Sequence, residues 1–227
     1  MIRRALRRLR SDESGLSITE LLVSSMLTLG ILVMIGNMFI QTAAITSQST
    51  QTNNSNNIAS NIANEVAATV RVATNLSKSG QALPDPAIVS GSREALTIYA
   101  LSNTDPANPA PVRVKYTINS DREVIEERCT GTASGGFWTF GSCASLTTRN
   151  LGGAVTTLTG VDDQFFTYYT AANQPIVIAA GNLTATQRAT VASIRIYVSV
   201  RADGSETKQA VISNTVFMGN LGLDQSE

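Results

Sequence analysis

Near the start of the chain the apolar positions form one long uncharged run rather than a periodic pattern. The run covers residues 21–40, LLVSSMLTLGILVMIGNMFI, and no charged residue occurs between Leu21 and Asn64. With a rise of about 1.5 Å per residue, a helix of this length extends for roughly 30 Å, which is the thickness of the hydrocarbon core of a bilayer. The run therefore predicts a transmembrane helix over residues 21–40.

After this run the apolar positions recur every fourth residue, as in an amphipathic helix. The stripe is formed by Ile58, Ile62, Val66 and Val70, with Ala59, Ala63 and Ala67 beside it. Ser77–Gly80 and two prolines stop the pattern, so we predict a helix over residues 16–76. Residues 41–57 are polar, uncharged and weak helix formers, and we expect this part to bend or partly melt.

Beyond residue 86 the pattern alternates with the period of a β-strand. Strands are predicted at residues 95–100, 112–118, 123–129, 191–201 and about 207–218, with the second and third forming a hairpin. The expected fold class is α+β, with a long N-terminal helix packed on an antiparallel β-sheet domain. The expected organisation is a basic leader at residues 1–15, the helix at 16–76 and a β-rich globular domain at 77–227.

Charge is distributed unevenly along the 227 residues. The leader holds Arg3, Arg4, Arg7, Arg8 and Arg10, which leaves 12 of the 17 basic and 15 of the 17 acidic residues beyond position 15. The arginines are expected to stay on the cytoplasmic side of a membrane, so that the bulk of the chain lies outside the cytoplasm. Outside the leader the sequence contains no basic cluster of the kind that would indicate direct nucleic-acid binding.

Catalytic and cofactor chemistry find little support in the sequence. The chain contains no histidine, which excludes Ser-His-Asp and Cys-His catalysis and His-ligated metal sites. Asp162 and Asp163 are adjacent acids, but without a ligand-rich loop they favour a turn before a strand over a metal site. We expect no enzyme activity, no metal and no cofactor.

Three interpretations of the N-terminal segment compete. An ordinary signal peptide would be cut after the apolar run, near residues 42–44, where the site is weak. A plain signal anchor fits the length and charge of the segment but gives no reason for Glu20, a carboxylate at the rim of a membrane span. The third interpretation accounts for this carboxylate.

Residues 15–20, Gly-Leu-Ser-Ile-Thr-Glu, followed by the apolar run, resemble the class III signal of type IV prepilins. The resemblance implies cleavage between Gly15 and Leu16 by a membrane aspartyl peptidase and N-methylation of Leu16, where phenylalanine is more usual. It also implies that Glu20 acts in filament assembly by pairing with the N-terminal amine of a neighbouring subunit. The alternative is a carboxylate that only snorkels to the lipid headgroups.

The predicted C-terminal strands restrict this resemblance to one group within the pilin-like family. Residues 193–201 and 213–221, together with the Phe-Thr-Tyr-Tyr segment within residues 161–170, are similar to minor pilins of the PilW type and to GspJ-type pseudopilins. The chain lacks the arginine that usually precedes Asn220 in that family. The resemblance implies a minor structural subunit of a type IV pilus, acting in priming or at the tip. A pseudopilin of a type II secretion or DNA-uptake machine and a pilin-anchored surface adhesin are the alternatives.

The resemblance also implies partners and a location. The expected partners are other pilins and minor pilins, the prepilin peptidase, the inner-membrane assembly platform and membrane lipid. The chain would cross the cytoplasmic membrane once, with its C-terminal domain outside the cytoplasm, and then enter a pilus or pseudopilus.

The only cysteines, Cys129 and Cys143, lie close in sequence in a chain that is expected to be exported. They predict one disulfide. The loop between them holds Phe137, Trp138 and Phe140. These aromatic residues are expected to cap the core, and an exposed loop that binds a partner is the alternative.

Overall fold

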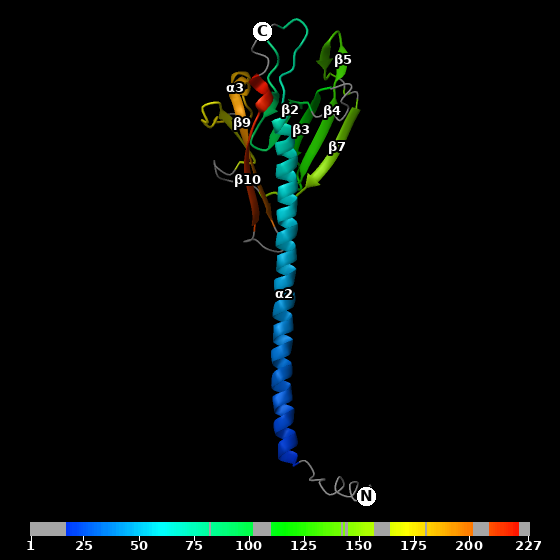
Figure 1. The fold of residues 1–227 in the computed structure, drawn as a ribbon, viewed down its shortest axis with the longest axis vertical. Helices are drawn as coiled ribbons and strands as arrows, with labels where there is room; N and C mark the ends of the chain where they lie inside the picture. The colour runs from blue at the N-terminus through cyan, green and yellow to red at the C-terminus, as the bar shows by residue number, and fades with distance from the viewer. Residues whose placement is uncertain are drawn as a thin grey trace, which may run out of the picture. The chain divides into compact units, whose positions relative to one another are not determined.

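The computed structural model describes residues 17–81, 83–101, 110–141, 143, 145–156, 164–179, 181–201 and 209–222. The chain divides into two compact units, one up to Thr50 and the other from Gln51. The fold is α+β, with one long N-terminal helix and antiparallel sheets, as the sequence predicts (Figure 1).

Helix α2 runs from Ile18 to Arg71, and its 54 residues correspond to a length of about 80 Å. It is helical throughout residues 41–57, so the predicted partial melting is not observed. The hydroxyls of Thr42, Thr46 and Thr50 donate to the backbone carbonyls four residues earlier, at 2.8, 2.8 and 3.0 Å. These hydroxyls donate to carbonyls of the same helix and do not compete for its backbone amides.

The helix ends five residues before the predicted boundary at residue 76 because the chain turns onto a strand. The Thr74 amide donates to the Tyr99 carbonyl at 3.0 Å, and the Leu101 amide donates to the Val72 carbonyl at 2.9 Å. Leu76 then exchanges backbone hydrogen bonds with Asp85. The segment after Arg71 therefore satisfies its backbone groups by lateral pairing rather than along the helix.

The first sheet is antiparallel, with strands in the order β1-β2-β3-β4-β7. These strands are β1 (Ile88–Gly91), β2 (Ala95–Ala100), β3 (Val112–Ile118), β4 (Val124–Thr130) and β7 (Ser145–Gly152). The predicted strands at 95–100 and 112–118 and the predicted hairpin are confirmed. A small hairpin, β5 (Thr132–Ser134) with β6 (Phe137–Thr139), lies between β4 and β7 in the sequence.

The second sheet has the order β10-β9-β8 and is also antiparallel. Its strands are β8 (Phe166–Thr170), β9 (Val191–Arg201) and β10 (Gln209–Phe217), so the predicted strand at 191–201 is confirmed. A short helix, α3 (Ala185–Thr190), precedes β9, and a 3-10 turn, η1 (Gly219–Gly222), follows β10.

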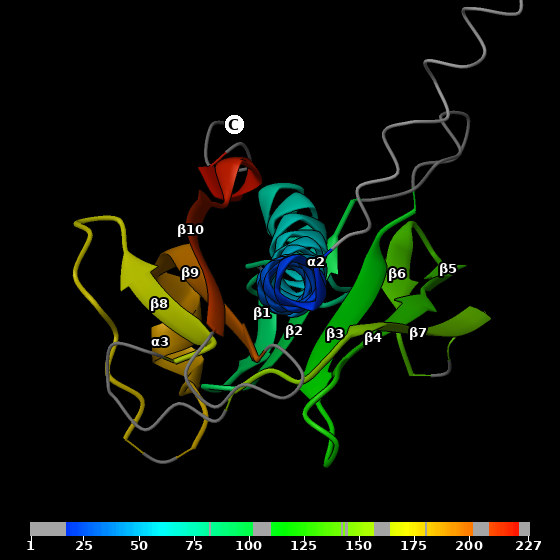
Figure 2. The same cartoon turned by 90° about the horizontal axis from the view of Figure 1, so that it is seen from below.

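The main core forms where the last turns of α2 meet both sheets. Figure 2 shows the two sheets on different sides of these turns. The predicted stripe is confirmed, since Ile62, Val66 and Val70 are all completely buried. They pack in one cluster with apolar residues of both sheets, including Leu96, Ile98, Val114, Phe166, Ile194, Ile196 and Val198. Burial of this stripe, rather than intrinsic propensity, is what fixes the C-terminal part of the helix.

Candidate functional site

The part of α2 that belongs to the first unit presents an exposed apolar surface over residues 21–40. Every residue from Ser17 to Thr50 is exposed, and Leu21, Met34 and Phe39 expose 60%, 75% and 74% of their surfaces. The helix is long and apolar enough to cross a membrane. An exposed apolar surface of this extent needs lipid or other apolar helices around it.

The hydroxyl groups within this apolar segment are satisfied by the helix itself. Ser24 and Ser25 donate to the carbonyls of Leu21 and Leu22 at 3.0 and 2.9 Å, and Thr28 donates to the carbonyl of Ser24 at 2.7 Å. Hydrocarbon offers no hydrogen-bond partner, so internal bonding lowers the cost of placing these groups in it. The segment suits an apolar environment despite its serines and threonines.

Glu20 is the one charged residue at the start of this surface. It lies in the first turn of α2, where the helix dipole favours a negative charge. It is exposed, and no ion pair or hydrogen bond joins its carboxylate to any other described residue. The predicted cleavage and methylation positions, Gly15 and Leu16, lie outside the described residues. The carboxylate of Glu20 therefore faces outward, toward whatever surrounds the helix.

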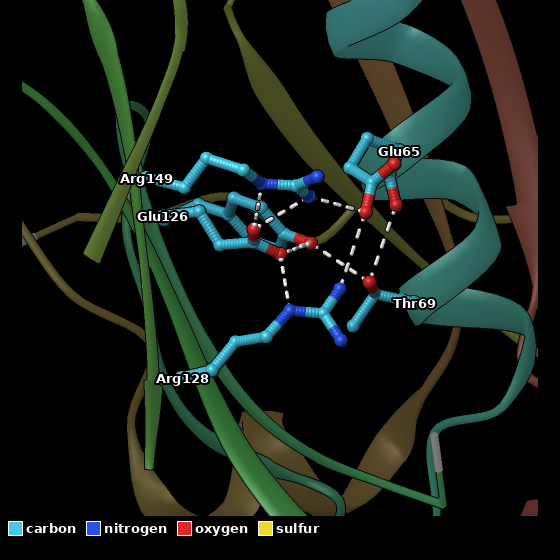
Figure 3. A network of polar contacts seen from close by, with 6 residues as sticks. Glu65, Thr69, Glu126, Arg128 and Arg149 are labelled. Atoms are coloured by element: carbon cyan, nitrogen blue, oxygen red, sulfur yellow. Dashed lines mark hydrogen bonds and ion pairs between the residues drawn. The ribbon is translucent and has the colours of Figure 1, made fainter. Parts of the chain in front are cut away.

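A second polar feature joins the other end of α2 to the first sheet. We call it the clasp; its members are Glu65, Thr69, Tyr116, Glu126, Arg128 and Arg149. Figure 3 shows how the five labelled members converge. Two come from α2, one from β3, two from β4 and one from β7. The sheet register places Tyr116 directly opposite Glu126 and Glu126 directly opposite Arg149. Three neighbouring strands thus present their polar side chains to one point on the helix.

Glu126 is the centre of the clasp and is only 1% exposed. One carboxylate oxygen accepts from the Tyr116 hydroxyl at 3.0 Å and from Arg128 Nε at 2.9 Å. The other accepts from Nε and Nη2 of Arg149 at 2.9 and 2.7 Å. A buried carboxylate is tolerated only when it is paired and hydrogen-bonded in this way.

Glu65 and Thr69 connect this centre to the helix. Glu65 forms ion pairs with Arg128, at 3.2 Å, and with Arg149, while the Thr69 hydroxyl lies 2.8 Å from the Tyr116 hydroxyl. Hydrogen bonding to Glu65 raises the pKa of Arg149, and burial raises the pKa of Tyr116. Two carboxylates and two guanidinium groups balance in charge, so the clasp is a neutral, satisfied link between helix and sheet.

The clasp was not predicted from the sequence. Its members are separated by up to 84 residues in sequence, and β7, which carries Arg149, was not predicted as a strand. The three consecutive charged residues at positions 126–128 are a local signal, but such a run is equally typical of a solvated strand.

The disulfide between Cys129 and Cys143 is confirmed. With Leu76, Tyr99 and Phe140, Cys129 forms a small second core cluster. Phe140 is 7% exposed, as expected for a residue that caps the core. Phe137 and Trp138 are only partly buried and line a cavity of about 570 Å³ beneath the β5–β6 hairpin.

Metal-ligating groups do not gather in the part of the chain that the structure describes, where no set of three or more His, Cys, Asp or Glu side chains could hold an ion. Asp162 and Asp163 lie outside the described residues.

Comparisons with known proteins supply no relative: neither the family models nor the curated proteins gave a match to this chain. The class of the protein therefore rests on its own geometry. A long apolar N-terminal helix, packed at its C-terminal end on antiparallel sheets, is an arrangement compatible with a pilin-like fold.

Proposed function

We propose that this chain is a minor structural subunit of a type IV pilus or a related filament, acting as a priming or tip component, and not an enzyme. The observation that carries the proposal is the difference in burial between the two ends of α2. Its last turns are buried in a folded domain, whereas residues 18–50 are all exposed, carry no charge except Glu20, and include the apolar run at residues 21–40. A helix that served only its own domain would not need an exposed apolar surface about 30 Å long.

The same surface suits two environments in turn. In lipid it would anchor the chain in the cytoplasmic membrane, with the leader arginines in the cytoplasm and the sheet domain outside. In a filament it would pack against the equivalent helices of other pilins and minor pilins. Its motif and its C-terminal strands resemble those of PilW-type minor pilins and GspJ-type pseudopilins, which supports membership of this class.

Glu20 has a specific part in the proposal. Cleavage after Gly15 by a prepilin peptidase would create an α-amine on Leu16, at the same end of the helix. When helices leave lipid and bundle, each carboxylate in the apolar bundle needs an opposite charge. The amine of a neighbouring subunit supplies it, and the inner-membrane assembly platform would bring the two chains together.

Substitution of Glu20 tests this role. Glu20→Ala is expected to leave membrane insertion and leader removal intact but to abolish co-immunoprecipitation with partner prepilins and to reduce the number of surface filaments. Glu20→Gln should be nearly as defective, because it keeps a polar side chain but loses the charge.

Thr19→Ala is the matched control, since Thr19 is an exposed polar residue of the same turn. It is expected to assemble normally. Normal partner binding and filament counts in the Glu20→Ala protein would show that the carboxylate only marks the membrane boundary, and would contradict the assembly role.

A further inference from the structure

The cavity beneath the β5–β6 hairpin lies entirely within the second unit and has no part in the clasp or in the apolar surface of α2. Its volume of about 570 Å³ falls within the range of about 300–1,000 Å³ that is usual for small-molecule sites. Its walls come from the segment after α2, from β2 and β3, and from the hairpin itself. The disulfide between Cys129 and Cys143 closes the hairpin loop and holds these walls together.

Aromatic side chains form much of the lining. Tyr99, Phe137, Trp138 and Phe140 all border the cavity. The rings of Tyr99 and Phe140 pack with centroids 5.1 Å apart and are tilted by 34°. Aromatic walls favour a ligand with a flat or ring-shaped apolar face over a bare ion.

One cation faces this cavity without a carboxylate partner among the described residues. Arg113 lies with its guanidinium carbon 5.7 Å from the centre of the Phe140 ring. Its Nη1 donates to the Phe140 carbonyl at 3.2 Å, and its Nη2 makes only long contacts, of 3.7 and 3.9 Å, to the two disulfide sulfurs. The guanidinium is therefore held in place with donor capacity to spare. Lys78 also lines the cavity, but it is paired with Asp85.

Hydroxyl groups complete the lining. The Tyr99 side chain is buried, and burial raises the pKa of its phenol, which stays a neutral hydrogen-bond donor. Its hydroxyl has no hydrogen-bond partner among the described residues. Ser79 and Ser134 also border the cavity.

We propose that this cavity binds an acidic sugar, with the ring stacked on the aromatic wall around Trp138 and the carboxylate on Arg113. A planar guanidinium matches a carboxylate with two parallel hydrogen bonds. The hydroxyls of Tyr99, Ser79 and Ser134 form hydrogen bonds with the hydroxyls of the sugar. The proposal concerns the exported domain and does not depend on the filament role of the helix.

Trp138 is the only tryptophan of the chain, so its fluorescence reports on this cavity alone. Glucuronate, titrated through the millimolar range into the full-length protein in detergent, is expected to change the emission in a saturable way. Glucose, which has the same ring without the carboxylate, should bind about tenfold more weakly or worse, because a charge-assisted hydrogen bond is lost. Inorganic phosphate should not displace the sugar.

Arg113→Met is expected to weaken glucuronate binding by about tenfold or more. Lys115→Met is the matched control, because Lys115 lies on the same strand but pairs with Glu127 and does not line the cavity. Equal responses to glucuronate and glucose, equal binding by the Arg113→Met protein, or displacement by phosphate would overturn the proposal.

Saturation-transfer NMR on the unmodified protein keeps the test independent of how the variants fold. The ring protons of glucuronate should receive saturation from the protein, and Trp138 emission should follow the same binding curve. Absence of transfer to these protons would also overturn the proposal.

Discussion

Removal of the Glu126 carboxylate tests the clasp most directly, because three other members of the clasp donate hydrogen bonds to it. In Glu126→Ala, the Tyr116 hydroxyl, Arg128 Nε and the Arg149 guanidinium each lose their acceptor in the buried centre. Glu65 would still pair with both arginines. The clasp would change from a neutral network to one with a net positive charge.

The size of the effect follows from burial. Breaking a buried ion pair by removing one partner costs about 3–5 kcal/mol. The side chains of Arg128 and Arg149 are 30% and 52% exposed, so water can partly replace the lost acceptor, and Tyr116 keeps Thr69. We therefore expect Glu126→Ala to lower the free energy of unfolding by about 2–4 kcal/mol. Glu126→Gln should cost less, because it keeps one acceptor oxygen.

Urea unfolding of the full-length protein in detergent, followed by Trp138 fluorescence, measures this difference. Glu127→Ala is the matched control on the same strand. Its pair with Lys115, at 3.0 Å, is 36% and 46% exposed, so its loss should cost no more than about 1 kcal/mol. If both alanine variants unfold at the same urea concentration with unchanged slopes, the clasp does not stabilise the attachment of the helix and the reasoning is refuted.

Two further predictions concern the folded domain. Cys143→Ser opens a loop with a sequence separation of 14 residues and should lower the free energy of unfolding by about 2–4 kcal/mol; a urea midpoint equal to that of the unmodified protein would contradict this. Stability should also fall as the pH rises above about 10, the pKa of an unfolded tyrosine. Burial raises the pKa of Tyr116 and Tyr168, so above that pH the unfolded chain releases protons that the folded chain retains. Urea midpoints measured from pH 8 to 11 should show a shallower fall for Tyr168→Phe, and an identical fall would contradict the assignment.

The sequence was most informative where a feature depends on local periodicity. The uncharged apolar run identifies a helix. The stripe of Ile62, Val66 and Val70 and the alternation along β9 each identify an element and its buried face. These patterns repeat within a few residues, so they can be read without knowing what packs against them. Cys129 and Cys143 could be paired because there is only one possible partner for each.

Other features depend on contacts between distant segments and could not be predicted. The helix ends at Arg71 because backbone pairing with β2 takes over, and nothing between residues 71 and 76 marks that point. Strand β7 has six exposed residues in a row, so its sequence lacks the alternation of a half-buried strand. The clasp needs β7 in register with β4 before Arg149 can reach Glu126, and Arg113 meets the aromatic hairpin only in the folded domain.

The N-terminus of the mature protein is the most direct test of the central claim, that the chain is processed as a pilin-like filament subunit. Mass spectrometry of the protein extracted from its native membrane should find a chain that begins at N-methylated Leu16, and Gly15→Val should leave the precursor uncut. A mature chain that begins near Ala43, or one that keeps the leader in otherwise active cells, would contradict the account.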